Sequence, residues 1–101
     1  MPNFSNAFTG NKCDRMLTEP ELIRSIRFMI AAEFEAVQLY MQLADSTNNK
    51  IAIKVLKGVA NEERVHAGEF LRLLKELAPE EEQYYNEGAT EVQMEIDKIN
   101  K

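Results

Sequence analysis

Apolar residues recur at alternating steps of three and four along the chain, which is the spacing of one packed face of an α-helix. The first apolar stripe consists of Ile23, Ile26, Ile30, Glu33, Val37 and Tyr40. After a short polar segment, the second consists of Ala52, Leu56, Val59, Glu63, His66, Phe70, Leu73 and Leu77. The pattern predicts two long helices that pack on each other through these stripes.

The first helix has a well-marked start. Thr18 can cap it, Glu21 can complete a capping box, and Pro20 is tolerated in the first turn. We expect this helix to run to about Asp45. Residues 1–17 lack the stripe pattern and are interpreted as an extended N-terminal arm.

Residues 46–49 are polar and predict a short turn, so the two helices should be antiparallel neighbours. The second helix should run from about Lys50 to Leu77, because Pro79 cannot continue it.

The remaining segment, 79–101, predicts a shorter C-terminal helix that Gly88 breaks or bends. Residues 18–101 are therefore expected to form an all-α unit, an antiparallel two-helix hairpin plus this shorter helix.

Three residues in the stripes carry ligand chemistry. Glu33 interrupts the first stripe, and Glu63 and His66, three residues apart, interrupt the second. Burying a carboxylate among apolar side chains is costly unless a partner such as a metal ion pairs with it. Pairing across the turn places Glu33 level with Glu63 and within one turn of His66. We therefore expect the three side chains to meet.

Carboxylate and imidazole ligands suit iron, manganese or zinc. A di-iron bundle site takes a Glu from each of two helices and a Glu-x-x-His from each of two others. One chain supplies half of that set, and two copies supply all of it. The sequence therefore predicts a homodimer that forms a four-helix bundle with the metal pair at its interface.

Composition narrows the classes of partner. The chain has 101 residues and a net charge of −5, and it lacks a basic patch, so a nucleic-acid partner is not expected. Its apolar runs are too short to predict a membrane span, and its N-terminus does not resemble a secretory signal. The single Cys13 excludes an internal disulfide and favours a reducing compartment.

The segments 33–40 (EFEAVQLY) and 61–67 (NEERVHA) resemble the encapsulated ferritins, ferritin-like proteins that are cargo of encapsulin nanocompartments. The resemblance covers about residues 20–77. It implies a ferroxidase that oxidises Fe(II) to Fe(III) with oxygen at a di-iron centre between two subunits. It further implies dimers assembled into a ring-shaped decamer, with iron stored inside the encapsulin shell, and hence a cytoplasmic location inside the nanocompartment.

By the same resemblance, Glu33, Glu63 and His66 are the metal ligands, with Glu63 bridging the two irons and Tyr40 near the centre. Some members have a second acidic pair at the entrance of the site; Glu35 matches one of its positions, whereas Ala32 stands at the other.

The residues leave alternatives open. The chain end, 97–101, does not look like the shell-docking peptide of cargo members, and a domain cut from a shell fusion would end in this way. An acidic helical binding module without metal fits the same hairpin. A different di-metal enzyme, such as a peroxide-reducing one, uses the same ligands.

Overall fold

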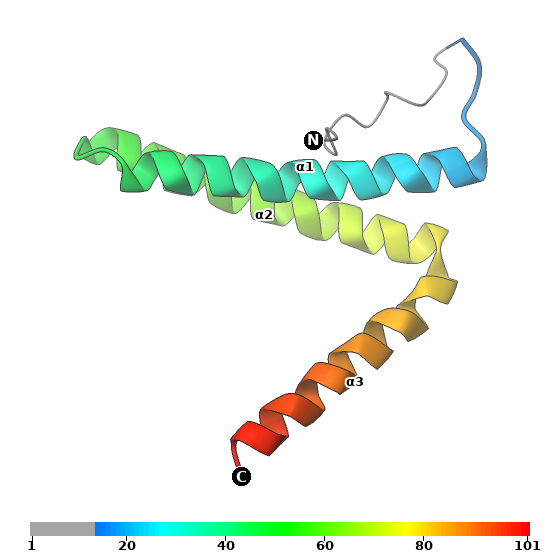
Figure 1. The fold of residues 1–101 in the computed structure, drawn as a ribbon. Helices are drawn as coiled ribbons and strands as arrows, with labels where there is room; N and C mark the ends of the chain where they lie inside the picture. The colour runs from blue at the N-terminus through cyan, green and yellow to red at the C-terminus, as the bar shows by residue number, and fades with distance from the viewer. Residues whose placement is uncertain (1–13) are drawn as a thin grey trace, which may run out of the picture.

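The computed structural model describes residues 14–101. Within them, the chain forms α1 (Glu19–Asp45), α2 (Lys50–Leu77), the short 3-10 helix η1 (Pro79–Glu81) and α3 (Glu82–Ile99). The helices α1 and α2 lie antiparallel and side by side, and α3 leaves the open end of the hairpin at an angle (Figure 1). The predicted all-α hairpin with a shorter C-terminal helix is confirmed. Most of the predicted arm, together with Cys13, lies outside the described residues.

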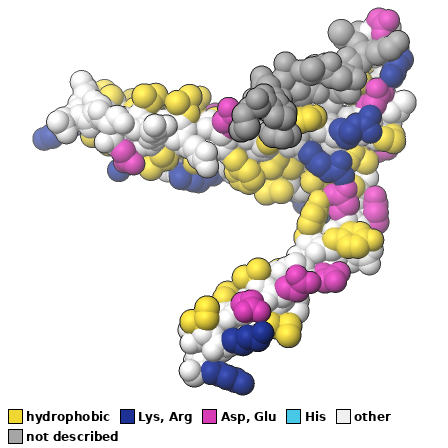
Figure 2. Space-filling view, viewed as in Figure 1, with side chains coloured by type: hydrophobic (Ala, Val, Ile, Leu, Met, Phe, Trp, Pro, Cys, Tyr) yellow, Lys and Arg dark blue, Asp and Glu magenta, His cyan; other side chains and the backbone are white. Residues whose placement is uncertain are grey.

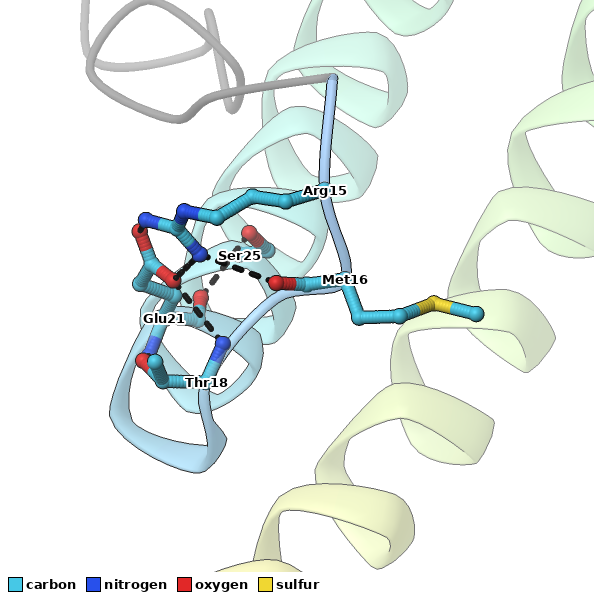
Figure 3. Close-up of polar contacts among 5 residues, drawn as sticks. All are labelled: Arg15, Met16, Thr18, Glu21 and Ser25. Carbon is cyan, nitrogen blue, oxygen red and sulfur yellow. Dashed lines mark hydrogen bonds and ion pairs between the residues drawn. The ribbon is translucent and has the colours of Figure 1, made fainter.

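The start of α1 is held by the predicted capping box. The Thr18 hydroxyl accepts a hydrogen bond from the Glu21 amide at 3.3 Å, and the Glu21 carboxylate accepts one from the Thr18 amide at 2.8 Å. Arg15 donates two more hydrogen bonds to that carboxylate, at 2.8 and 2.9 Å (Figure 3). Chiefly because of the hydrogen bond from Arg15, the pKa of Glu21 is lowered from its ordinary value of 4.5 to about 2. The segment before α1 is thereby fastened to the first turn of the helix.

The ends of α2 also follow the prediction. Asn49 caps the helix by accepting a hydrogen bond from the Ala52 amide at 3.0 Å. At the other end, the Ala78 amide bonds to the carbonyl of Leu74 at 2.8 Å, and Pro79 begins η1. A polar cap and a proline therefore limit the helix to the predicted residues.

The hydrophobic core lies at the open end of the hairpin. There Ile26 and Ile30 of α1 meet Leu74 and Ala78 of the second half of the chain. Partly buried side chains pack around them: Leu22, Ile23, Phe70 and Leu77.

The face of α2 that packs on α1 is not the predicted one at every position. Ala60, Ala67 and Leu74 are buried, whereas His66 and Leu73, which the stripe assigned to this contact, are exposed. The stripe followed the larger side chains because an alanine carries only a weak apolar signal. Small residues allow two helices to approach closely, so the buried face is shifted by one residue in these turns. His66 consequently lies at the margin of the hairpin contact.

The third helix is continuous, so the predicted break at Gly88 is wrong. A Cβ placed on Gly88 would meet no atom within 4 Å, so no close approach requires a glycine there. One glycine in a helix costs only about 1 kcal/mol relative to alanine. The good helix formers on either side of Gly88 are enough to continue the helix through it.

Residues 78–82, which we call the elbow, are fastened to the hairpin by ion pairs. Arg27 of α1 pairs with Glu81, whose carboxylate also accepts a hydrogen bond from Tyr85 of α3. Lys75 of α2 pairs with Glu82 at 2.8 Å. Both long helices therefore contribute to the direction in which α3 leaves the hairpin.

A single chain leaves much apolar surface uncovered. Its radius of gyration is 17.6 Å, against about 13 Å for a compact chain of this length. Figure 2 shows apolar side chains over both the hairpin and α3. The exposed ones include Phe34, Leu39, Val55, Val65, Tyr84, Val92, Met94 and Ile96. Within residues 14–101, none of the helices has the length and hydropathy needed to cross a membrane.

Candidate metal centre

The middle of the hairpin brings together the three residues that interrupt the stripes. Glu33 comes from the middle of α1, and Glu63 and His66 come from adjacent turns of α2. One carboxylate or imidazole atom from each lies within 4.8 Å of the others. The structure thus brings the three side chains to one place, and their role as metal ligands stays a prediction.

The distances from His66 to the two carboxylates are longer than direct hydrogen bonds. His66 Nδ1 lies 3.7 Å from Glu33 Oε2 and 3.5 Å from Glu63 Oε2. Both distances exceed the 2.7–3.2 Å range of an N–H···O hydrogen bond. Two ligand atoms about 2.1 Å from one ion lie roughly 3 to 4.2 Å apart, depending on the angle between them. The distance of His66 from each carboxylate is therefore compatible with one bound ion.

The burial of Glu33 is a second observation that is compatible with a bound cation. Its side chain is 17% exposed, and its Oε2 is buried without a hydrogen-bond partner among the described residues. An unpaired buried polar atom is destabilising unless something outside the protein chain pairs with it. The carboxylate of Glu33 therefore fits a cation, and the oxygen and nitrogen donors suit iron, manganese or zinc.

Exposure differs across the cluster. The side chain of Glu63 is 19% exposed, and that of His66 is 48% exposed. His66 is therefore only partly covered at the margin of the α1–α2 contact, which leaves the cluster open on one side. One chain supplies two carboxylates and one imidazole there.

The open side is a cavity of about 240 Å³ lined by Glu33, His66, Glu69 and Phe70. The sequence analysis did not single out Glu69. It lies three residues after His66, so the same helical spacing that paired Glu63 with His66 was the available signal.

Other residues near the centre have separate surroundings. Arg64 donates a hydrogen bond to Asn61 at 2.6 Å and so belongs to the outer surface of α2. Tyr40 is half-buried on α1. Ala32 and Glu35 line a different cavity, of about 280 Å³, where only one of the two carries a carboxylate.

Comparison with known proteins gives a consistent assignment. Residues 26–101 match the family model described as Rubrerythrin. The encapsulin nanocompartment cargo protein EncC of Myxococcus xanthus is 45% identical over 67 residues, which are 66% of this chain and 52% of that protein. The ferritin-like–encapsulin shell fusion protein of Pyrococcus furiosus is 41% identical over 68 residues, which are 67% of this chain and 20% of that protein. The chain thus matches about half of the first relative and a fifth of the second.

The crystal structure of the encapsulated ferritin domain from Pyrococcus furiosus has the same fold. The TM-score is 0.79 at 38% sequence identity, and the match covers 83% of this chain and 85% of that one. These findings confirm the resemblance to encapsulated ferritins that segments 33–40 and 61–67 indicated.

Proposed function

Because this chain belongs to the rubrerythrin family of ferritin-like proteins, we propose that it is a ferroxidase, with a di-iron centre shared by two copies. The observation that carries the proposal is the buried Glu33 Oε2, which lies beside Glu63 and His66 without a hydrogen-bond partner among the described residues. Fe(II) is the substrate in this reaction. When bound, it loses an electron to oxygen and becomes Fe(III).

The ligand count supports a shared centre. One chain offers two carboxylates and one imidazole, which are too few for two ions. Two chains related by a two-fold axis offer twice as many, the complete ligand set of a di-iron bundle site. The four carboxylates would also balance the charge of two Fe(II) ions. We therefore propose Glu33, Glu63 and His66 as the residues that would hold the irons, and the resemblance to the encapsulated ferritins implies that Glu63 would be the ligand shared by both.

The uncovered surface supports a second copy at this position. His66 and Leu73 lie on one side of α2, outside its buried contact with α1. A second hairpin packed on that side would cover both residues and complete a four-helix bundle. Larger assembly of such dimers into a ring-shaped decamer follows from the resemblance to the encapsulated ferritins.

Each residue would have a distinct task in this centre. The carboxylates of Glu33 and Glu63 would hold the cations close enough for both to transfer electrons to oxygen. The imidazole of His66 would complete the coordination from the open side. Exclusion of water by the second copy would strengthen these interactions, because electrostatic attraction increases as the dielectric constant falls.

We further propose that the chain acts inside an encapsulin nanocompartment in the cytoplasm, where the oxidised iron is stored. The support is the nature of two of its relatives, one an encapsulin nanocompartment cargo protein and the other a ferritin-like–encapsulin shell fusion protein.

Fe(II) oxidation by single variants tests the proposal. Glu33→Ala, Glu63→Ala and His66→Ala should each abolish fast oxidation in air and stoichiometric iron binding, and Glu62→Ala should retain both. Light scattering with and without Fe(II) should show metal-promoted assembly, because the ligands come from two chains. Wild-type oxidation rates in all three ligand variants would refute the assignment.

Two further outcomes would replace the proposal. Assembly without stoichiometric iron, unaffected by Glu63→Ala, would favour a metal-free binding module. Rapid turnover of hydrogen peroxide with slow oxidation by oxygen would favour a peroxide-reducing enzyme.

A further inference from the structure

The charges of the chain are divided unevenly between its C-terminal segment and α2. Residues 79–101 contain seven acidic residues and two lysines, so they carry a net charge of −5, equal to that of the entire chain. Figure 2 shows acidic side chains over the elbow and α3. On α2, four exposed cationic residues share one side of the helix, at steps of four, three and seven residues. We call them the basic row: Lys50, Lys54, Lys57 and Arg64.

The basic row lies on the side of α2 opposite to His66. Each residue turns an α-helix by about 100°. Arg64 and Lys57 precede His66 by two and nine residues, so they point about half a turn away from it. A second copy that shares the metal centre on the His66 side would therefore leave the basic row uncovered.

The structure already joins this side of α2 to a carboxylate of α3. Lys75 follows Lys57 by 18 residues, which are about five helical turns, so it continues the basic row. It pairs with Glu82 at 2.8 Å. Beyond the elbow α3 diverges from α2 (Figure 1), and its main contacts within the chain are with η1. The later carboxylates of α3 accordingly form no ion pair with the basic row of their own chain within residues 14–101.

Charges on both surfaces lack an oppositely charged partner in the described part of the chain. Lys57 forms no hydrogen bond or ion pair there, and Arg64 donates to the neutral side chain of Asn61. On α3, Glu87 and Glu91 are exposed and likewise unpaired. They are four residues apart and therefore lie on one side of that helix.

We propose that the acidic side of α3, with Glu87 and Glu91, docks on the basic row of α2 in a second copy of the chain. The opposite charges of the two surfaces select this occupant, and the Lys75–Glu82 pair is a contact of the same kind within one chain. The proposed contact is separate from the metal centre. A chain that makes both contacts, each with a different copy, would link dimers into a larger assembly.

Charge reversal in the full chain, at low salt and with a chelator, tests this contact. Lys57→Glu/Arg64→Glu and Glu87→Lys/Glu91→Lys should each raise the Kd of self-association about tenfold, measured by sedimentation equilibrium. High salt should raise the Kd of the wild type. The two variants change the net charge in opposite directions, so general repulsion between acidic chains would weaken association in the first and strengthen it in the second.

A matched control reverses charge on another side of α3. Gln93 and Asp97 are already hydrogen-bonded to each other at 3.0 Å, and they lie more than a quarter turn from Glu91. Gln93→Lys/Asp97→Lys should therefore change the Kd by less than about twofold.

Mixing the two reversed variants distinguishes a contact between copies from one within a chain. In the mixture, the reversed row of one variant meets the reversed α3 of the other, so the Kd should return to within about threefold of the wild type. A mixture as weak as its components would overturn the proposal, and so would a wild type that does not self-associate at low salt. Weakening in the basic-row variant alone would indicate a different anionic partner and would also overturn it. Because the chelator removes metal, these results are independent of whether the chain oxidises Fe(II).

Discussion

Replacing Glu33 with leucine should make the metal-free protein more stable. The side chain of Glu33 is 17% exposed, and its Oε2 is buried without a hydrogen-bond partner among residues 14–101. Leucine has a similar size and has no polar atom to leave unpaired. The substitution therefore removes an unfavourable group and adds an apolar one at the same place.

The size of the effect follows from those contacts. Leaving a buried polar group unpaired costs about 1–3 kcal/mol. The variant also loses the approach of Glu33 Oε2 to His66 Nδ1 at 3.7 Å, which is worth less than about 1 kcal/mol because His66 is half-exposed. The expected net gain is about 1–2 kcal/mol, and each kcal/mol raises the Tm of a domain of this size by roughly 4–8 °C.

Thermal unfolding measures the stability of the metal-free protein in the presence of a chelator, and that of the metal-bound protein in the presence of Fe(II) without oxygen. In chelator, Glu33→Leu should melt above the wild type, and the control Glu35→Leu should shift the unfolding free energy by less than about 0.5 kcal/mol. Fe(II) at 100 times its Kd should stabilise the wild type by about 2.7 kcal/mol and leave Glu33→Leu unchanged. A metal-free Glu33→Leu that melts below the wild type would refute the reasoning, because Oε2 would then have a stabilising partner in the protein.

Three further substitutions test the fold. The pKa of Glu21 is lowered from 4.5 to about 2, so its contribution to stability is complete above about pH 4.5 and disappears as the pH falls towards 2. The Tm difference between the wild type and Glu21→Gln, followed by circular dichroism, should narrow over that window; a constant difference would contradict the ion pair with Arg15. Ala60 is 0% exposed, so Ala60→Leu should lower the free energy of unfolding in urea by about 1–3 kcal/mol, whereas Leu at the exposed Lys57 should change it little. Gly88→Ala should stabilise α3 by up to about 1 kcal/mol, seen as slower amide hydrogen exchange in residues 82–99, and faster exchange there would show that Gly88 is needed.

The ends of the hairpin helices were predictable because local chemistry determines them. Thr18 and Glu21 form the capping box through contacts within one turn, and Pro79 lies where α2 can no longer continue. The meeting of Glu33 with Glu63 was predictable for a related reason. A short turn sets the register of two antiparallel helices, so positions equally far from the turn lie opposite each other.

The buried face of α2 was not predictable from residue size alone. Two neighbouring sides of α2 are both apolar, one including Ala67 and the other including Leu73. Which side faces α1 depends on how closely the helices approach, a property of the pair. The cavity beside Glu69 was not predictable either, because it exists only once both helices are in place. The contact of Arg27 with Glu81 joins residues 54 positions apart, too far for any local pattern to indicate.

The elbow has a geometric consequence for the far end of the chain. At 1.5 Å per residue, the 18 residues of α3 extend about 27 Å from their base. Over that distance a tilt of about 10° displaces the tip by about 5 Å, nearly the pitch of the helix. The pairs Arg27–Glu81 and Lys75–Glu82 lie at the pivot of this lever. A small rearrangement of these two ion pairs would therefore displace the tip of α3 much further than the base of that helix. The candidate ligands lie on α1 and α2, which such a tilt of α3 would leave in place.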